Sequence, residues 1–420
     1  MPDVGDRVAV RRLVERFGFG PAPGDLDRLT AQGFDRTAGD LLSTVDDRGA
    51  PPPQLDAEPK QDRTALRTQQ VAITLWWLDR MAASDSPLLE RVTWLWHGHF
   101  ATSVQKVRSA HLMLAQNITL RQHGLGDFAV LAKAMVADPA MLVWLDGQKN
   151  TAKAANENLA RELMELFTLG VGHYSEQDVR EAARALTGWK VNRDNGTASL
   201  APRQHDTKDK TVLGHTGNLD APGLVDLLLA QPASPRFIAG RLWLRLVGGT
   251  PDDATLDRLT ERYGPNRDIR ALLRAIAAEP AFRDPASTVV KQPVDWAVGL
   301  MRALRLRPSA LPEGDRTKLL AGLRGMGQVP FVPPSVGGWP SGPAWLTTSA
   351  GLSRLQVARL LAGHADLTSI SGDDSVTAVG ALLGVDAWSE RTRNALSTVA
   401  HAPDQLVAVA ATAPEYVVSG

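Results

Sequence analysis

The chain has 420 residues with 46 basic and 46 acidic side chains, so its formal net charge is zero. A neutral chain argues against a dedicated nucleic-acid-binding protein, because such proteins carry a basic surface that releases counterions. The absence of cysteine excludes disulfides, iron–sulfur clusters, cysteine-ligated zinc and a cysteine nucleophile. The composition is that of a globular protein, and the length suggests two or three packed units.

The first residues and the hydropathy pattern bear on the location of the protein. Residues 1–20 contain neither the apolar core nor the small-residue cleavage site of a signal peptide. No run of about 18 apolar residues occurs, so no membrane span is expected. These features predict a cytoplasmic protein, and only a signal removed before residue 1 would change this prediction to an exported one.

In chain order, the hydrophobic periodicity predicts a mostly α fold, a multi-helix globular array. The expected helical stretches are 8–20, 64–96, 106–145, 156–169, 176–187, 219–281, 288–306, 314–325, 350–363 and 375–411. Residues 188–218 are polar and contain Asn195-Gly196, a hairpin signal, so they predict a small β or loop excursion. We expect one module, 1–420, with two packed helical lobes of about 1–187 and 219–420 joined by this excursion.

The stretch 156–169 carries the strongest local pattern. On an α-helix, Glu157, Arg161 and Glu165 share one arc with Asn158 and Glu162, opposite a side filled by leucine, methionine and phenylalanine. A solvated face with an Arg161–Glu165 pair is one interpretation. The other is a carboxylate cluster that holds a metal or acts as acid and base, with the three side chains pointing into the protein.

Two histidine segments are further candidates for a site. His97 and His99 would point about 200° apart on a helix, but they would face the same side of an extended segment and there could ligate one metal ion. A hydrogen-bonded structural role is the alternative. His205-Asp206 lies in the polar excursion, either as part of a site or as a solvent-exposed turn. We expect this excursion to lie close to the 157–165 helix.

Two other segments have structural explanations. Ser175 and Asp178 are suited to capping the helix 176–187. Residues 325–346, rich in glycine, proline and tryptophan, are too apolar for a free loop. They predict an irregular, ordered cover with Trp339 buried, either as a plug of the core or as the lining of a cleft.

These segments, in this order, resemble the bacterial family catalogued as domain of unknown function 1800. The matching residues are Arg11-Arg12-Leu13, Phe17 to Pro21, Trp96 to Phe100, the block 156–170, Tyr174, Glu176, Asp178, Glu181, Arg184, Thr187 to Trp189, His205-Asp206, Lys210, Leu242-Trp243, Lys291 and Gly338 to Pro340. The resemblance spans almost the whole chain, which implies a single family module of no established activity. Such proteins are often found beside a second, exported family, which implies a protein partner. This chain departs from them in lacking an export signal and in having Lys208 where they usually have glycine.

Two functional hypotheses follow. The first is an enzyme, acid/base or assisted by a divalent metal, whose site combines Glu157, Arg161 and Glu165 with His205 and Asp206 and with His97 and His99. The second is a non-enzymatic helical scaffold or maturation partner for another protein, with the polar residues forming an internal hydrogen-bond network. The sequence determines neither the substrate, nor the metal, nor the oligomeric state.

Overall fold

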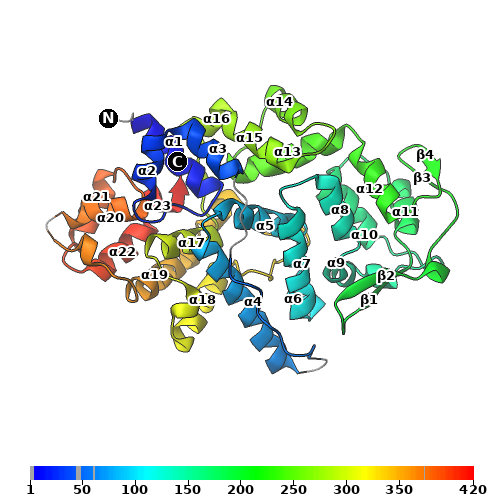
Figure 1. Ribbon diagram of the computed structural model, residues 1–420, viewed down its shortest axis with the longest axis horizontal. Helices are drawn as coiled ribbons and strands as arrows, with labels where there is room; N and C mark the ends of the chain where they lie inside the picture. Colours follow the sequence, from blue (N-terminus) through cyan, green and yellow to red (C-terminus); the bar gives the residue numbers. More distant parts are fainter. Residues whose placement is uncertain (1–3, 44–48, 60–61, 373) are drawn as a thin grey trace.

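A computed structural model describes residues 4–43, 49–59, 62–372 and 374–420. As predicted, the described chain is mostly helical, with 23 α-helices and three small two-stranded sheets (Figure 1). None of the helices in this described part is both long and apolar enough to cross a membrane.

One hydrophobic cluster is formed by helices between residues 9 and 282. It includes Phe17, Phe100, Phe128, Phe167 and Phe282, all fully buried. The helices that contribute to it are α1 (Val4–Arg16), α2 (Asp25–Gln32), α3 (Phe34–Ser43), α5 (Pro87–His99), α7 (Ala110–His123), α8 (Phe128–Val136), α9 (Pro139–Trp144), α10 (Asn158–Glu162), α11 (Glu176–Ala185), α12 (Ala221–Leu229), α13 (Ala233–Leu246), α14 (Asp253–Tyr263), α15 (Ile269–Ala278) and α16 (Pro280–Arg283).

A second cluster is built on Trp77, Trp296 and Phe331. Its helices are α4 (Arg63–Ala83), α6 (Val104–Val107), α17 (Pro293–Ala303), α18 (Glu313–Gly325), α19 (Thr348–Ala362), α20 (Ser375–Leu383), α21 (Glu390–Ser397), α22 (Pro403–Thr412) and α23 (Pro414–Val417), with parts of α5, α7 and α9. The clusters divide the chain differently from the predicted lobes, since α12 to α16 pack with α1 and α4 packs with α17. The lobe boundaries at 187 and 219 remain a prediction.

Buried arginines of α1 join the two ends of the chain. Arg12 and Arg16 are almost fully buried, and they donate to the carbonyls of Phe282 (2.9 Å) and Ser419 (2.9 Å). Burial lowers the pKa of Arg16 to about 9. A buried ion pair of 2.8 Å joins Glu15 to Lys291. Arg12 and Arg16 therefore have a structural role, because they bind buried carbonyl oxygens near the end of the chain and in α16.

The excursion 188–218 is two small hairpins, which confirms the predicted β excursion. Strand β1 (Trp189–Asn192) pairs with β2 (Thr197–Leu200), leaving Asn195-Gly196 in the connecting loop. Strand β3 (Lys210–Val212) pairs with β4 (His215–Gly217) and packs on α11. Its two-residue turn has positive φ at both positions, as expected for a tight hairpin turn. A third sheet joins β5 (Val289–Val290) to β6 (Val418–Ser419) next to α1.

The segment 325–346 is an irregular cover, as predicted. Beyond the end of α18 its only regular element is a short 3-10 helix, η5 (Gly342–Trp345), and Trp339 is 4% exposed. Gly338 lies directly on the helix α5, because a Cβ atom at this position would approach the Gly98 carbonyl oxygen to 2.2 Å. The cover is thus packed against the Trp96–Phe100 segment by a contact that only glycine permits.

Candidate functional site

The stretch 156–169 is not one α-helix, which corrects the prediction. The α-helix α10 ends at Glu162, and the chain continues as a π-helix, η2 (Leu163–Thr168). The Leu169 amide donates to the Met164 carbonyl five residues earlier, and the Thr168 hydroxyl donates to the Leu163 carbonyl. A π-helix widens the turn, so Glu165 leaves the position that α-helical periodicity gave it. Single π-turns of this kind are frequent at functional sites.

Arg161 holds two helices together at the surface. It donates to Glu157, the residue before α10 (3.2 Å), and, with both terminal nitrogens at 2.8 Å, to Glu176 at the start of α11. The side chains of Arg161 and Glu157 remain 33% and 39% exposed. The expectations that this triad points into the protein and that Arg161 pairs with Glu165 are therefore wrong. The ion pairs lie at the surface, and Arg161 pairs with Glu176 instead of Glu165.

Glu165 instead accepts a hydrogen bond from the Tyr174 hydroxyl at 2.7 Å. The pKa of Tyr174 is raised by burial and by this bond, so its hydroxyl keeps its proton. Glu162, one turn before Glu165, has a raised pKa because of burial and of the neighbouring charge of Glu165. We call this half-exposed group the carboxylate face; it consists of Glu157, Arg161, Glu162, Glu165, Tyr174 and Glu176.

The start of α11 brings Glu176 to the carboxylate face. Ser175 accepts from the Asp178 amide, and Asp178 accepts from the Ser175 amide at 2.8 Å, which forms a capping box. This confirms the predicted capping roles. The cap fixes where α11 begins, and so it sets the distance from Glu176 to Arg161.

His205 and Asp206 lie against the last turn of α11. Asp206 accepts from Arg184 at 2.8 Å, which lowers the pKa of the carboxyl group. The His205 Nδ1 atom lies 2.9 Å from the Thr187 carbonyl oxygen. Arg184 and Glu176 are eight residues apart, or roughly 12 Å along a helix. The excursion is ordered against α11, but among the residues described no hydrogen bond or ion pair joins His205 or Asp206 to the carboxylate face.

Lys210, close to Asp206, is fully buried and used internally. It donates to the Asn218 side chain and the Leu219 carbonyl, each at 2.9 Å, and also to the Asp206 carbonyl. The loop around His205-Asp206 is therefore held in place by its own polar groups.

His97 and His99 are buried in the interior. Both belong to α5, which continues through Gly98 to His99, so the extended segment required for a shared metal ion is not formed. His97 Nε2 accepts from the Phe331 amide at 3.1 Å, and His99 Nε2 lies 3.0 Å from the Phe167 carbonyl oxygen. Burial lowers the pKa of each to about 3, and the charge of Arg241 contributes at His99.

The two histidines thus connect three segments of the chain. His97 binds the cover 325–346, and His99 binds the Phe167 carbonyl of the π-helix η2. The His97 ring packs among Trp77, Trp94, Phe331 and Trp339, with centroids 5.2 to 5.9 Å away. Within the described ranges, no three His, Asp or Glu side chains are grouped to hold one metal ion. The geometry gives no support to a metal shared by His97 and His99.

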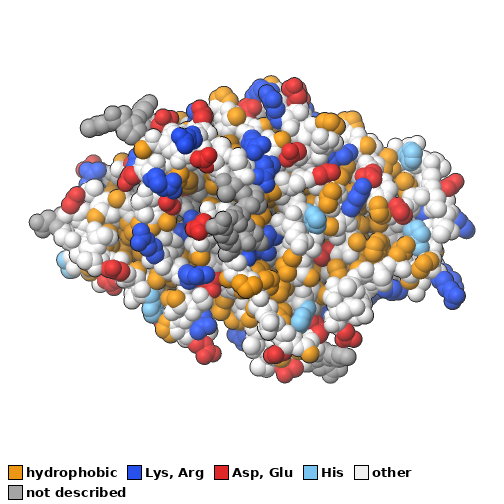
Figure 2. All heavy atoms as spheres, in the orientation of Figure 1, with side chains coloured by type: hydrophobic (Ala, Val, Ile, Leu, Met, Phe, Trp, Pro, Cys, Tyr) orange, Lys and Arg blue, Asp and Glu red, His pale blue; other side chains and the backbone are white. Residues whose placement is uncertain are grey.

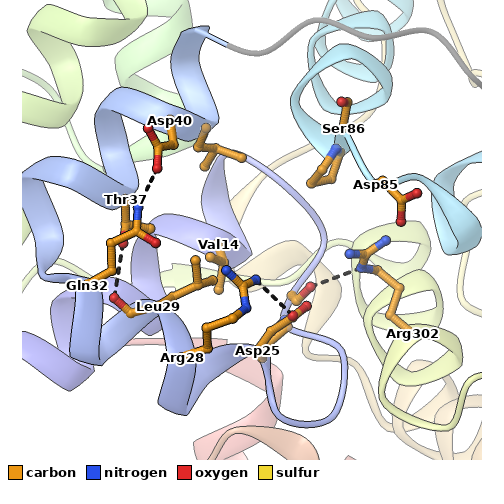
Figure 3. Close-up of a pocket in the computed structure, with 14 residues that line it drawn as sticks. Val14, Asp25, Arg28, Leu29, Gln32, Thr37, Asp40, Asp85, Ser86 and Arg302 are labelled. Carbon is orange, nitrogen blue, oxygen red and sulfur yellow. Dashed lines mark hydrogen bonds and ion pairs between the residues drawn. The ribbon is translucent and has the colours of Figure 1, made fainter.

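A cavity of about 220 Å³ lies between α2, α3, the start of α5 and α17 (Figure 3). Its polar side chains largely face one another: Arg28 pairs with Asp25 at 3.1 Å, and Gln32 donates to Asp40. Arg302 points at the Gly20 carbonyl oxygen and at the carbonyls that end α4. Because these groups already have partners, the cavity offers few free polar atoms to a ligand.

Sequence reasoning missed part of the carboxylate face. Glu162 lies on the predicted polar arc but was not chosen as a site residue, and Tyr174 and Glu176 come from the following segment. The only available signal for them was the short connection between the two helical stretches, which predicts a hairpin of adjacent helices.

Comparison with known proteins assigns the family. Residues 12–418 match the family described as "Protein of unknown function (DUF1800)". No curated protein and no solved structure matches the chain. Since the match covers nearly the whole sequence, the chain belongs to the DUF1800 family.

Proposed function

We propose that this member of the DUF1800 family is an acid/base enzyme that acts on a polar substrate at the carboxylate face. In this proposal Glu162 donates a proton and Glu165 accepts one. The observation that carries it is the difference between these two carboxyl groups, which lie one turn apart. Glu162 has a raised pKa, whereas Glu165 is fixed as the acceptor of the Tyr174 hydroxyl. Many enzymes divide the acid and base roles between two neighbouring carboxyl groups that have different surroundings.

The other atoms of the face suit this chemistry. Tyr174 holds Glu165 through Oε2, and no described residue hydrogen-bonds to Oε1, which is left to accept a proton from a substrate hydroxyl or a water. The face carries four glutamates and one arginine, so it favours a polar substrate that is neutral or cationic.

Glu157 and Arg161 act in the proposal as positioning residues, since they join α10 to α11 through Glu176. His205 and Asp206 form a separate candidate at the other end of α11. A carbonyl oxygen only accepts, so the Nδ1 atom of His205 donates to Thr187, and in this candidate Nε2 is the ring nitrogen that contacts a substrate. A metal-assisted variant of the proposal would use Glu162 and Glu165 as oxygen ligands of a divalent cation.

The test compares glutamine variants on a panel of chromogenic esters, amides, glycosides and phosphate esters. For any compound turned over, Glu162→Gln and Glu165→Gln should each lower kcat/KM by about 10²-fold or more. The control Glu261→Gln, on the exposed side of α14, should retain the wild-type rate. Circular dichroism should show all three variants folded, and elemental analysis of the purified protein decides whether a metal takes part. Turnover that both variants retain would remove the carboxylate face from the mechanism.

The second hypothesis, a non-enzymatic scaffold for a partner protein, is favoured by a different observation. Two cavities of about 730 and 770 Å³ lie along α4, and no residue of the carboxylate face lines them. Wild-type folding and partner binding in both glutamine variants, with no turnover by any protein, would support the scaffold instead of the enzyme.

A further inference from the structure

A long groove runs between α4 and α18. The first half of α4 and one side of α18 line a cavity of about 730 Å³. It continues past Gln105 into a second cavity of about 770 Å³, which shares Arg63, Leu66 and Gln70 with the first. Figure 1 places both helices at the lower edge of the molecule. We call this feature the α4–α18 groove.

The floor of the groove is apolar. It is formed by Leu66, Val71, Leu75, Leu320, Val329 and Val332, which come from α4, α18 and the cover 325–346. Four of them, Leu66, Val71, Leu75 and Val332, are only partly buried. In Figure 2, hydrophobic side chains gather in the middle of the lower half of the view, over the part that α4 occupies in Figure 1. Apolar surface of this kind is stabilised when a partner covers it.

The rim of the groove is basic, although the whole chain is neutral. Five arginines and two carboxylates line the two cavities: Arg63, Arg67, Arg108, Arg316, Arg324, Asp62 and Glu313. Asp62 is occupied in capping α4, where it accepts from the amides of Thr64 and Ala65.

Arg63, Arg67 and Arg324 are exposed, and no carboxylate of the described chain pairs with them. By contrast, Arg161, Arg184 and Arg258, on other surfaces, each pair with a glutamate or aspartate. Cations clustered on one apolar groove and left without intramolecular partners are complementary to an anionic ligand.

We propose that the α4–α18 groove binds an acidic amphipathic helix of a partner protein. Its apolar face would cover the floor, and its aspartates and glutamates would pair with Arg63, Arg67 and Arg324 on the two rims. A groove between two helices fits a third helix, which is a common way to recognise amphipathic segments. The thirteen residues of α4 from Arg63 to Leu75 span roughly 18 Å, the length of a helix of about three turns. The inference holds whether or not the carboxylate face is catalytic.

The groove favours a protein helix over the other anionic partners. A nucleic acid would need cations that follow its phosphates, with aromatic platforms for its bases, whereas this floor is aliphatic. An anionic membrane would meet a convex basic surface more readily than a concave groove. Both classes are included in the test as competing outcomes.

The experiment uses the full chain and a labelled helical peptide of about 15 residues, with leucines spaced i, i+3, i+4 and i+7 and glutamates on both flanks. A control peptide has lysine in place of each glutamate. Fluorescence anisotropy should show binding of the glutamate peptide that weakens as salt rises from about 50 to 300 mM, because rim charges are screened. The lysine peptide should bind about tenfold more weakly or not at all.

Charge reversal then locates the site. Arg67→Glu combined with Arg324→Glu should weaken the glutamate peptide by about tenfold or more, because both rims lose their cations. The matched control, Arg203→Glu combined with Arg391→Glu, reverses two exposed arginines elsewhere and should bind like the wild type. Equal binding by both double variants would overturn the proposal. The proposal would also be overturned if the wild-type protein did not bind the peptide, or if it bound single-stranded DNA or phosphatidylserine vesicles instead.

Discussion

Two regions are rich in side chains that can carry chemistry: the segment around His97 and His99, and the carboxylate face. They differ in how far their side chains are exposed to solvent. The histidines are 1% and 5% exposed, and their pKa values are lowered to about 3. The carboxylate face is half exposed, and Glu162 has a raised pKa. Burial keeps the imidazoles neutral and fixed at neutral pH, whereas the glutamates remain open to solvent and to a substrate.

The comparison shows that residue type alone does not identify a site. Imidazoles hydrogen-bonded to backbone atoms on two different segments serve to hold those segments together. The Glu165–Tyr174 pair is likewise satisfied, but it lies at the surface, where its free oxygen can meet another molecule. A substitution in a structural region should therefore lower the stability of the protein more than a substitution in a region that carries chemistry.

The largest effect is expected from His97→Ala. The change removes a ring packed among four aromatic side chains and leaves the Phe331 amide without its acceptor. We expect a loss of about 3–5 kcal/mol in the free energy of unfolding, as for other large-to-small core substitutions that also lose a buried hydrogen bond. Thermal and urea unfolding measure it, with exposed His401→Ala as the matched control. A loss below about 1 kcal/mol would mean that His97 is not a structural residue.

A smaller effect is expected from pH. The folded pKa of about 3 at His97 lies below the ordinary 6.5, so the unfolded chain binds a proton that the folded chain does not. Stability should therefore be unaffected by this group above pH 6.5 and should fall as pH decreases from 6.5 toward 3. The slope is at most about 1.4 kcal/mol per pH unit for each histidine.

The variant His97→Gln isolates this contribution. Its amide oxygen can accept from the Phe331 amide but does not titrate, while other groups such as Glu90, whose pKa is lowered by its arginine partners, titrate in both proteins. Melting curves between pH 7 and 5 should show a shallower decline for the variant than for the wild type. Parallel curves would show that His97 titrates near its ordinary pKa and is not held neutral by burial.

Much of the fold follows from local sequence signals. The Ser175 cap and the Asn195-Gly196 hairpin depend on neighbouring residues, and each is found where the sequence places it. Helical periodicity correctly predicts a mostly α fold, although 163–168 is a π-helix and 289–290 is a short strand. The density of glycine and proline in 325–346 likewise predicts an irregular segment, and its tryptophans predict burial. Such signals work because the interactions behind them span only a few residues.

The site was harder to predict because it depends on contacts between segments. The π-helix at 163–168 moves Glu165 off the α-helical arc, and periodicity contains no signal for it. Arg161 pairs with Glu176, fifteen residues later in the chain, and not with Glu165. The helix α5 continues through Gly98 to His99, so the extended segment that a shared metal ion needs is not formed, and Gly338 of the cover packs directly on the Gly98 carbonyl. Tertiary packing decided each of these cases.

The smallest effect is expected at the surface ion pairs of the carboxylate face. Arg161→Gln removes both the Glu157 and the Glu176 contacts, but the side chains involved are 33%, 39% and 64% exposed. Solvent already screens such charges, so we expect a loss of only about 0.5–1 kcal/mol in the free energy of unfolding. The loss should shrink at about 0.5 M salt, where exposed charges interact over only a few ångströms. This salt dependence is what separates the face from the interior, since the His97→Ala effect arises from packing and should persist in salt. A salt-independent loss of 3 kcal/mol or more would place Arg161 in a buried network and erase the contrast between the two regions.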